Sequence, residues 1–158
     1  MNVRPYTMAD LGAVVALFTA SVHELGATHY SAKQRDAWAP RSPDMAAWAL
    51  RFAELQTLLL LDEGGLAGFV SYEVNGHLDL LYTAPRTARQ GVASRLLKQV
   101  EQALPGVEQF TEASLIAKPF FLRHGFQVTE AQVVVRRGVS FSRFAMRKGV
   151  EGQAKEGV

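Results

Sequence analysis

The stretch from His77 to Leu104 constrains the fold of this 158-residue chain more than any other part of it. His77 to Thr83 is a short run rich in apolar residues that suits a buried strand, and Pro85 ends it. Apolar residues then recur on one helical face, at Val92, Leu96, Leu97, Val100 and Leu104. The stretch therefore predicts a strand, a turn that contains glycine, and an amphipathic helix.

The turn from Arg89 to Ser94 predicts an anion site. A helix that begins here presents unpaired backbone N–H groups and the positive end of its dipole to whatever lies before it. Gly91, Ala93 and Ser94 are small, so a ligand could approach the backbone, and a pyrophosphate would suit the site. The alternative is that Gly91 is only a turn glycine before a packed helix. Neither G-x-x-x-x-G-K-[ST] nor a G-x-G-x-x-G after a strand is present, so two common nucleotide-binding loops are unsupported.

Composition narrows the class of protein. With 48% apolar and 20% charged residues, the chain is predicted to be a single globular domain over residues 1–147, followed by a polar, disordered tail at 148–158. No apolar run of about 18 residues is expected to span a membrane, and no secretory signal is expected. A net charge of +2 without a block of like charges argues against nucleic acid. Cysteine is absent, which excludes thiolate metal sites and favours a reducing cytoplasm; no metal is expected.

The rest of the chain alternates hairpin and helix patterns. Helices are predicted at 11–22, from Ser31 through Trp38, from the N-cap Ser42 to about Leu55, and at 116–123. Further strands are predicted at 3–5, 57–61, 66–73, 109–114, 131–136 and 141–146, with Asn75-Gly76 as a hairpin turn. Hairpins mixed with strand–helix–strand crossovers imply an α/β fold with a mixed sheet and helices on both faces.

Three segments, in this order, resemble the GCN5-related N-acetyltransferase (GNAT) superfamily. Residues 3–6 resemble its opening strand, Gly91-Val92-Ala93 matches the second half of its Q/R-x-x-G-x-G/A motif, and residues 117–126 resemble its A-x-x-F-Y-x-x-x-G-F segment. Ala88 stands where Gln or Arg is usual, and Arg89 or Gln90 is available in its place. The resemblance implies a GNAT-like fold with a mixed, mostly antiparallel sheet of about seven strands, of which the fourth and fifth splay apart.

The resemblance implies an acetyl-CoA-dependent N-acetyltransferase that acetylates a primary amine of a small molecule or peptide by direct attack in a ternary complex. The alternative is a non-catalytic module that binds acyl-CoA or a partner. Expected cofactor contacts are Leu81, Tyr82, Thr83, Arg89, Gln90, Gly91, Val92, Ala93, Ser94, Ser114 and Phe121. For Ser114 the alternative is a strand-end hydroxyl that caps the next helix.

Period-two alternation puts His77 and Asp79 on one face of their strand, together with Leu81 and Thr83. The resemblance implies a base among these residues, with Glu73 as a third candidate. Alternatively, His77 follows a surface turn and Asp79 is a partly solvated edge residue. Acetyl transfer also requires a proton for the departing thiolate.

The family's usual acid is a tyrosine at the position of Phe121, and phenylalanine has no proton to donate. Tyr82 and Tyr30 are the remaining candidates, and direct loss of the thiolate to water is the other route.

The resemblance places the acceptor between the first helices and the last hairpin. Candidate residues for binding it are His29, Tyr30, Trp38, Glu73 and Phe141, with His23 nearby. Aromatic and histidine side chains would suit an aromatic or small amine, whereas Trp38 on a short amphipathic helix could equally belong to the core. The sequence does not name the amine, and a homodimer is left open.

Overall fold

The computed structural model describes residues 1–149, and most of the predicted tail at 148–158 lies outside the described residues. Seven strands form one sheet in the order β1-β2-β3-β4-β5-β7-β6. They are β1 Asn2–Pro5, β2 Gln56–Asp62, β3 Gly65–Tyr72, β4 His77–Thr83, β5 Gln109–Ser114, β6 Gln127–Arg136 and β7 Val139–Lys148. Every neighbouring pair is antiparallel except β4 and β5, which confirms the mixed, mostly antiparallel sheet.

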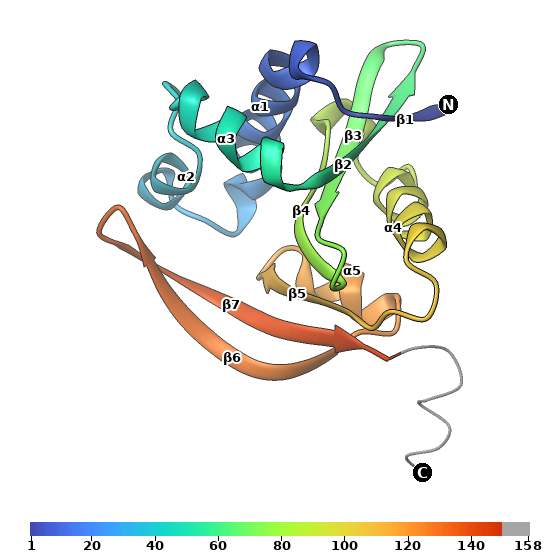
Figure 1. Cartoon of the computed structure of the whole chain (residues 1–158). Coiled ribbons are helices and arrows are strands. Elements are labelled where there is room, and N and C mark those ends of the chain that lie inside the picture. The colour runs from blue at the N-terminus through green and yellow to red at the C-terminus, as the bar shows by residue number, and fades with distance from the viewer. Residues whose placement is uncertain (150–158) are drawn as a thin grey trace.

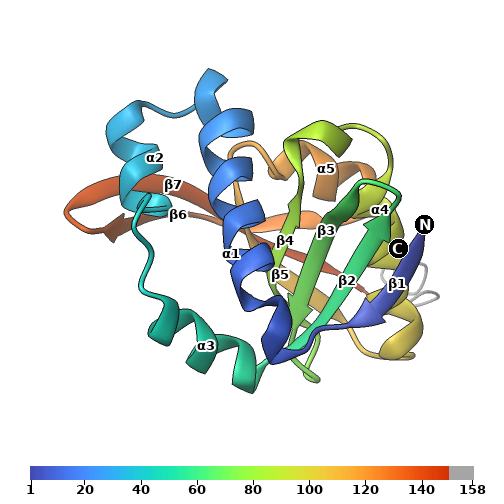
Figure 2. The ribbon, with the colours of Figure 1, turned by 90° about the horizontal axis from the view of Figure 1, so that it is seen from above.

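Helices cover both faces of the sheet, as predicted (Figures 1 and 2). They are α1 Leu11–Ala20, α2 Ala32–Trp38, α3 Met45–Glu54, α4 Val92–Ala103 and α5 Lys118–Arg123. One core lies under α4 and α5 and includes Leu60, Val70, Leu96, Val100 and Phe121. A second core lies under α1 and α3 and includes Val14, Phe18, Phe52, Phe69 and Leu80. We call these two sides the α4 face and the α1 face.

The starts of the helices follow their capping residues. Ser31 and Gln34 form the predicted capping box, with each backbone N–H donating to the other's side chain at 3.0 and 3.1 Å. The prediction that Ser42 caps the next helix is wrong by two residues. Asp44 is the cap, because its carboxylate accepts from the N–H of Ala47 at 3.0 Å, and α3 therefore begins at Met45.

The helical stretch Met8–Thr28, whose central part is α1, corrects one expectation. By length and composition alone it could cross a membrane. Its apolar side is used inside the protein, however, because Val14, Phe18 and Val22 are buried in the second core. A buried core helix passes the same test, so the stretch is weak evidence for a membrane span.

β4 and β5 pair over only two positions before they part. His77 lies opposite Phe110 and Leu78 opposite Thr111, and the Thr111 hydroxyl adds a bond to the carbonyl of Leu78 at 2.9 Å. Both strands continue beyond this point without further pairing to each other within residues 1–149. The expected splay of the fourth and fifth strands is therefore present, and one edge of β4 is left without a strand neighbour.

A β-bulge at Asp79 changes which side chains share a face. On β3, Tyr72 pairs with Leu78 and the preceding residue pairs with Leu80, so Asp79 is the extra residue. Leu78 consequently packs on the α4 face, whereas Leu80 packs on the α1 face. The strict alternation expected from the sequence is thus wrong beyond Asp79. Leu81 packs against the α4 core, and Tyr82 takes the α1 face.

Gly68 on β3 permits the close approach of α4 to the sheet. A Cβ atom there would lie 2.6 Å from Val92 Cγ1 and 2.9 Å from the backbone oxygen of Tyr82. We expect Gly68→Ala to lower the free energy of unfolding by about 1–3 kcal/mol, since overpacking forces β4 and α4 to move. Chemical denaturation measures this change.

The matched control is Gly12→Ala in α1, where a Cβ atom meets nothing within 4 Å. We expect it to be neutral or to stabilise by up to about 1 kcal/mol, through helix propensity. Equal stabilities of the Gly68 and Gly12 variants would contradict the packing role of Gly68.

Candidate functional site

The N-terminus of α4 is an open cradle of backbone donors. Gly91 is the N-cap, with φ +80°, and a Cβ atom on it would meet nothing within 4 Å. Among residues 1–149 no acceptor is found for the N–H groups of Val92, Ala93 and Ser94. Space and unpaired donors at the positive end of a twelve-residue helix fit a phosphate-bearing ligand.

Gln90 and Arg89, two predicted cofactor contacts beside Gly91, differ in their surroundings. Gln90 turns back and donates from Nε2 to the carbonyl of Arg86 at 3.1 Å. Arg89 is exposed, adopts φ +62°, and forms no ion pair within the described part of the chain. Of the two residues that could replace the missing motif residue at position 88, Arg89 is therefore the one whose side chain is available to bind an anion.

Ser94 is oriented by a histidine that the sequence did not single out as functional. His124 Nδ1 donates to the carbonyl of Phe120 at 2.8 Å, because a carbonyl can only accept. In the neutral ring Nε2 then accepts from the Ser94 hydroxyl at 2.9 Å. The serine on the first turn of α4 is therefore held by a side chain from the end of α5.

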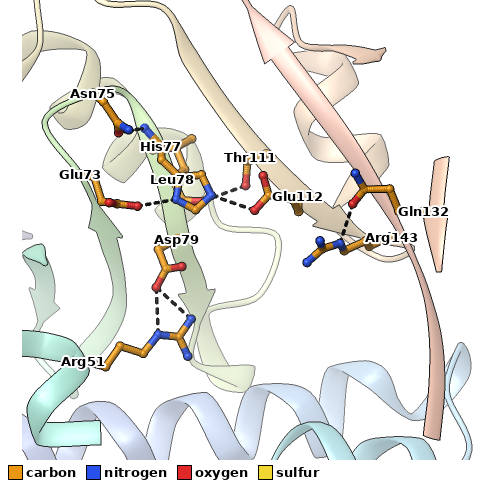
Figure 3. Close-up of polar contacts among 10 residues, drawn as sticks. All are labelled: Arg51, Glu73, Asn75, His77, Leu78, Asp79, Thr111, Glu112, Gln132 and Arg143. Atoms are coloured by element: carbon orange, nitrogen blue, oxygen red, sulfur yellow. Dashed lines mark hydrogen bonds and ion pairs between the residues drawn. The ribbon is translucent and has the colours of Figure 1, made fainter. Parts of the chain in front are cut away.

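His77 lies between two carboxylates (Figure 3). Its Nδ1 is 2.7 Å from Glu73 Oε1 and its Nε2 is 2.8 Å from Glu112 Oε1. Ionised carboxylates only accept, so the ring must carry both protons to make both bonds. Burial by itself lowers the pKa of His77, but the hydrogen bonds to Glu112 and Glu73, with the charges of Glu112 and Asp79, outweigh it and raise the pKa overall.

Asp79 faces α3 and is held by one of its two oxygens. Its Oδ2 accepts a hydrogen bond from Arg51 Nε at 2.9 Å and forms an ion pair with Arg51 Nη2 at 2.8 Å. The guanidinium of Arg51 in turn lies 5.2 Å from the centre of the Trp48 ring. Over residues 1–149, no partner is found for Asp79 Oδ1, which leaves this oxygen free to accept a proton.

Tyr82 keeps its proton over the whole physiological range. Burial raises the pKa of its hydroxyl to about 12, against the opposing effects of a hydrogen bond with Trp38 and the charges of Arg51 and Arg136. Its ring packs against Phe18 with centroids 4.9 Å apart. Tyr82 can therefore donate a proton on the α1 face but cannot serve there as a base.

Most of the expected acceptor-binding residues pack against one another. Tyr30, Trp38 and Phe141 form a cluster with centroids 5.2 to 6.2 Å apart, and Tyr30 and Phe141 are each only 7% exposed. The hydroxyl of Tyr30 accepts from the N–H of Leu115 at 2.9 Å. His29 is exposed and bonds to Thr28 instead, so the structure does not bring it into this cluster.

Two expected cofactor contacts have structural partners. Ser114 Oγ accepts from the N–H of Ala117 at 3.1 Å, which is the capping alternative considered from the sequence. Phe121 is 4% exposed and packs edge-on against Phe126, with centroids 5.0 Å apart. Its side chain fills the α4 core, so position 121 has an apolar packing role in addition to lacking a hydroxyl.

Tertiary structure adds residues that sequence reasoning missed, namely Glu112, which bonds to His77, and Arg51, which holds Asp79. Arg143 of β7 lies opposite Ser114 of β5. A period-two pattern on 109–114 could have paired Glu112 with Ser114, but nothing local places it opposite His77. No group of three or more His, Asp or Glu residues able to hold a metal occurs within residues 1–149. A surface pocket of about 490 Å³, lined mainly by residues of α1 and of the loop before α3, contains none of the titratable residues of β4.

Comparison with known proteins assigns the family. The profile of the acetyltransferase (GNAT) domain matches residues 26–148. An uncharacterized N-acetyltransferase of Escherichia coli (strain K12), YafP, is 35% identical over 147 residues, which cover 93% of this chain and 95% of that protein.

The solved structures that share the fold include two N-acetyltransferases. A GCN5-related N-acetyltransferase from Rhodopseudomonas palustris, also named aminotransferase, class-II, is 30% identical with a TM-score of 0.89, and the match covers 94% of this chain and 95% of that one. The PaiA N-acetyltransferase of Thermoplasma acidophilum, in complex with coenzyme A, has a TM-score of 0.75 at 17% identity, covering 94% and 98%. The domain match over most of the chain and the relative that aligns along nearly its whole length show that this chain belongs to the GNAT family and is an acetyltransferase.

Proposed function

We propose that the protein transfers an acetyl group from acetyl-CoA to a primary amine of a small molecule or peptide, by direct attack of the amine in a ternary complex. The parting of β4 and β5 beside the open N-terminus of α4 carries this proposal. It sets an unpaired strand edge next to backbone donors for a pyrophosphate. Acetyl-CoA supplies the activated acetyl group. The lack of cysteine supports a cytoplasmic site of action.

Backbone groups and one side chain of this protein would together bind acetyl-CoA. The N–H groups of Val92, Ala93 and Ser94 hold the pyrophosphate, with Arg89 as the nearby cation. The free edge of β4 after Leu78 offers backbone partners to the pantetheine arm and to the thioester carbonyl. Backbone donors of this kind stabilise a developing oxyanion without reorganising during the reaction.

We expect Gly91→Glu to abolish binding of acetyl-CoA measured by calorimetry. The substitution puts bulk and negative charge where the pyrophosphate approaches. Gly106→Glu is the matched control, because Gly106 lies just beyond the other end of α4, also has positive φ (+77°), and has equally open surroundings. Unchanged affinity in a folded Gly91→Glu variant would remove the cradle from the mechanism.

Asp79 is the proposed base, through its free Oδ1, directly or by way of a water molecule. His77 lies two residues away on the same strand and, as the imidazolium, adds positive charge beside the site. When the pH rises through its raised pKa, the ring loses a proton and can accept one itself. The acceptor amine must be neutral to attack, so these groups matter most where the amine is mainly protonated.

We expect Asp79→Asn and His77→Gln to lower turnover by about 10²- to 10⁴-fold below the pKa of the acceptor amine, with a defect that shrinks as pH rises. A pH–rate profile from free-thiol release measures this. Variants that follow the wild-type profile throughout would exclude both residues as bases.

The contribution of His77 to folding stability can be distinguished from its contribution to turnover, because the stability contribution depends on pH in a known direction. Because folding raises its pKa, the stability it adds is fully present below about pH 6.5 and is lost as pH rises through the raised value. His77→Gln should therefore lose most stability in acid. Urea denaturation at several pH values separates this loss from the loss in turnover.

Tyr82 is the proposed proton donor to the departing thiolate. We expect Tyr82→Phe to lower kcat by about 10²-fold or more while acetyl-CoA affinity is kept. Tyr72→Phe is the matched control, because Tyr72 is a buried tyrosine that packs in the α4 core, whereas Tyr82 is partly buried on the α1 face. A loss of less than about tenfold for Tyr82→Phe would show that the thiolate leaves unassisted, since tenfold corresponds to only about 1.4 kcal/mol of barrier.

A further inference from the structure

Arg143 on β7 lies on the α1 face, close to the catalytic strands. It is paired with Ser114 of β5 on one side and with Gln132 of β6 on the other. It is two residues from Phe141, whose ring packs against α2, so the two side chains share a face. Glu112 pairs with Ala145, which is two residues further along β7, and therefore also projects on this face.

The guanidinium of Arg143 is held in one orientation. Its Nε donates to Gln132 Oε1 at 2.7 Å, and the amide nitrogen of Gln132 donates to Glu130. This chain sets the amide with its oxygen toward the arginine. Only Nε is used in the chain, and the terminal nitrogens point back toward the strands that carry Glu112 and Asp79 (Figure 3).

Arg143 also differs from its neighbours in charge pairing. Arg51 is paired with Asp79 and Arg147 with Glu108. Arg143 is partly buried, and no carboxylate oxygen lies within 4.0 Å of it in the described residues. A partly desolvated cation without a counter-ion is costly, and an anionic ligand would relieve that cost.

The same face carries the opposite charge one or two strands away. Asp79 keeps one free oxygen beside Arg51, and Glu73 and Glu112 together carry one negative charge more than the imidazolium of His77 that lies between them. This excess of negative charge on β4, β5 and the residue after β3, together with a guanidinium on β7 that has no carboxylate partner among the described residues, suits a ligand that has an ammonium at one end and an anion at the other. The planar fork of arginine matches the two oxygens of a carboxylate.

We propose that Arg143 binds the carboxylate of the acceptor, and that the acetylated amine therefore belongs to a free amino acid or a similar carboxylate-bearing amine. The inference rests on the proposed function and names the substrate class of the same site. In this proposal Arg143 determines which amine is bound, and it takes no part in the proton transfers.

The test compares each free amino acid with its own carboxamide, which keeps the shape and removes the negative charge. With the full chain and acetyl-CoA, free-thiol release gives kcat/KM for each pair, and calorimetry in the presence of coenzyme A gives affinity without turnover. We expect the best amino acid to exceed its amide by about ten- to a hundredfold, the range for a hydrogen bond to a charged group. Arg143→Met should remove this preference by raising KM, and Arg143→Lys should restore part of it.

Arg147→Met is the matched control, because it makes the same change on the same strand at a residue that already has a carboxylate partner. It should keep the preference. Equal kcat/KM for acids and amides, an Arg143→Met variant that keeps the preference, or no acceptor among the carboxylates while acetyl-CoA still binds would each overturn the inference. A stronger response to aminomethylphosphonate than to glycine would overturn the choice of a carboxylate. Failure to bind acetyl-CoA would instead count against the proposed function.

Discussion

The brief pairing of β4 with β5 is the constraint on which the rest of the site depends. Two paired positions and the Thr111 hydroxyl hold the strands together at one end, and beyond them the strands diverge. A sheet that stayed paired would satisfy the edge of β4 internally and leave no backbone partners for a ligand. The bulge at Asp79 occurs one residue after the last paired position, so it changes the side-chain order where the strand becomes free.

Charged side chains on the α1 face lie beside the point where β4 and β5 part. His77 is held between Glu73 and Glu112, and Asp79 is held by Arg51, so each potential proton-transfer group has a neighbour that fixes its orientation. These contacts join β4, β5, α3 and the residue that follows β3, so the arrangement exists only when all of these elements are in place (Figure 3). In the proposed mechanism, proton transfer and acceptor recognition would use one network, because the carboxylates that can take a proton also attract an ammonium.

Apolar packing provides the rigid support for this network. Tyr30 and Phe141 are buried with Trp38, so the last hairpin is joined to α2 by aromatic contacts across a long stretch of sequence. The aromatic residues that the sequence predicts for acceptor binding therefore hold the last hairpin against α2. On the α4 face of the sheet, Phe121 fills the core, and Gly68 allows Val92, the first residue of α4, to pack closely against β3.

Local sequence determined the secondary structure, the mixed sheet and the N-terminus of α4, because hydrophobic periodicity, capping residues and Gly91 act over a few positions. His77, Asp79, Tyr82 and Glu73 were also recognisable as candidates, since they lie on or beside one predicted strand. Only tertiary structure decided their partners and their faces. Arg51, Glu112 and Arg143 come from elements far apart in the chain, and the bulge that moves Tyr82 to the α1 face depends on how β4 registers against β3. Strand register and long-range charge pairing are properties of the folded sheet, which no period within β4 specifies.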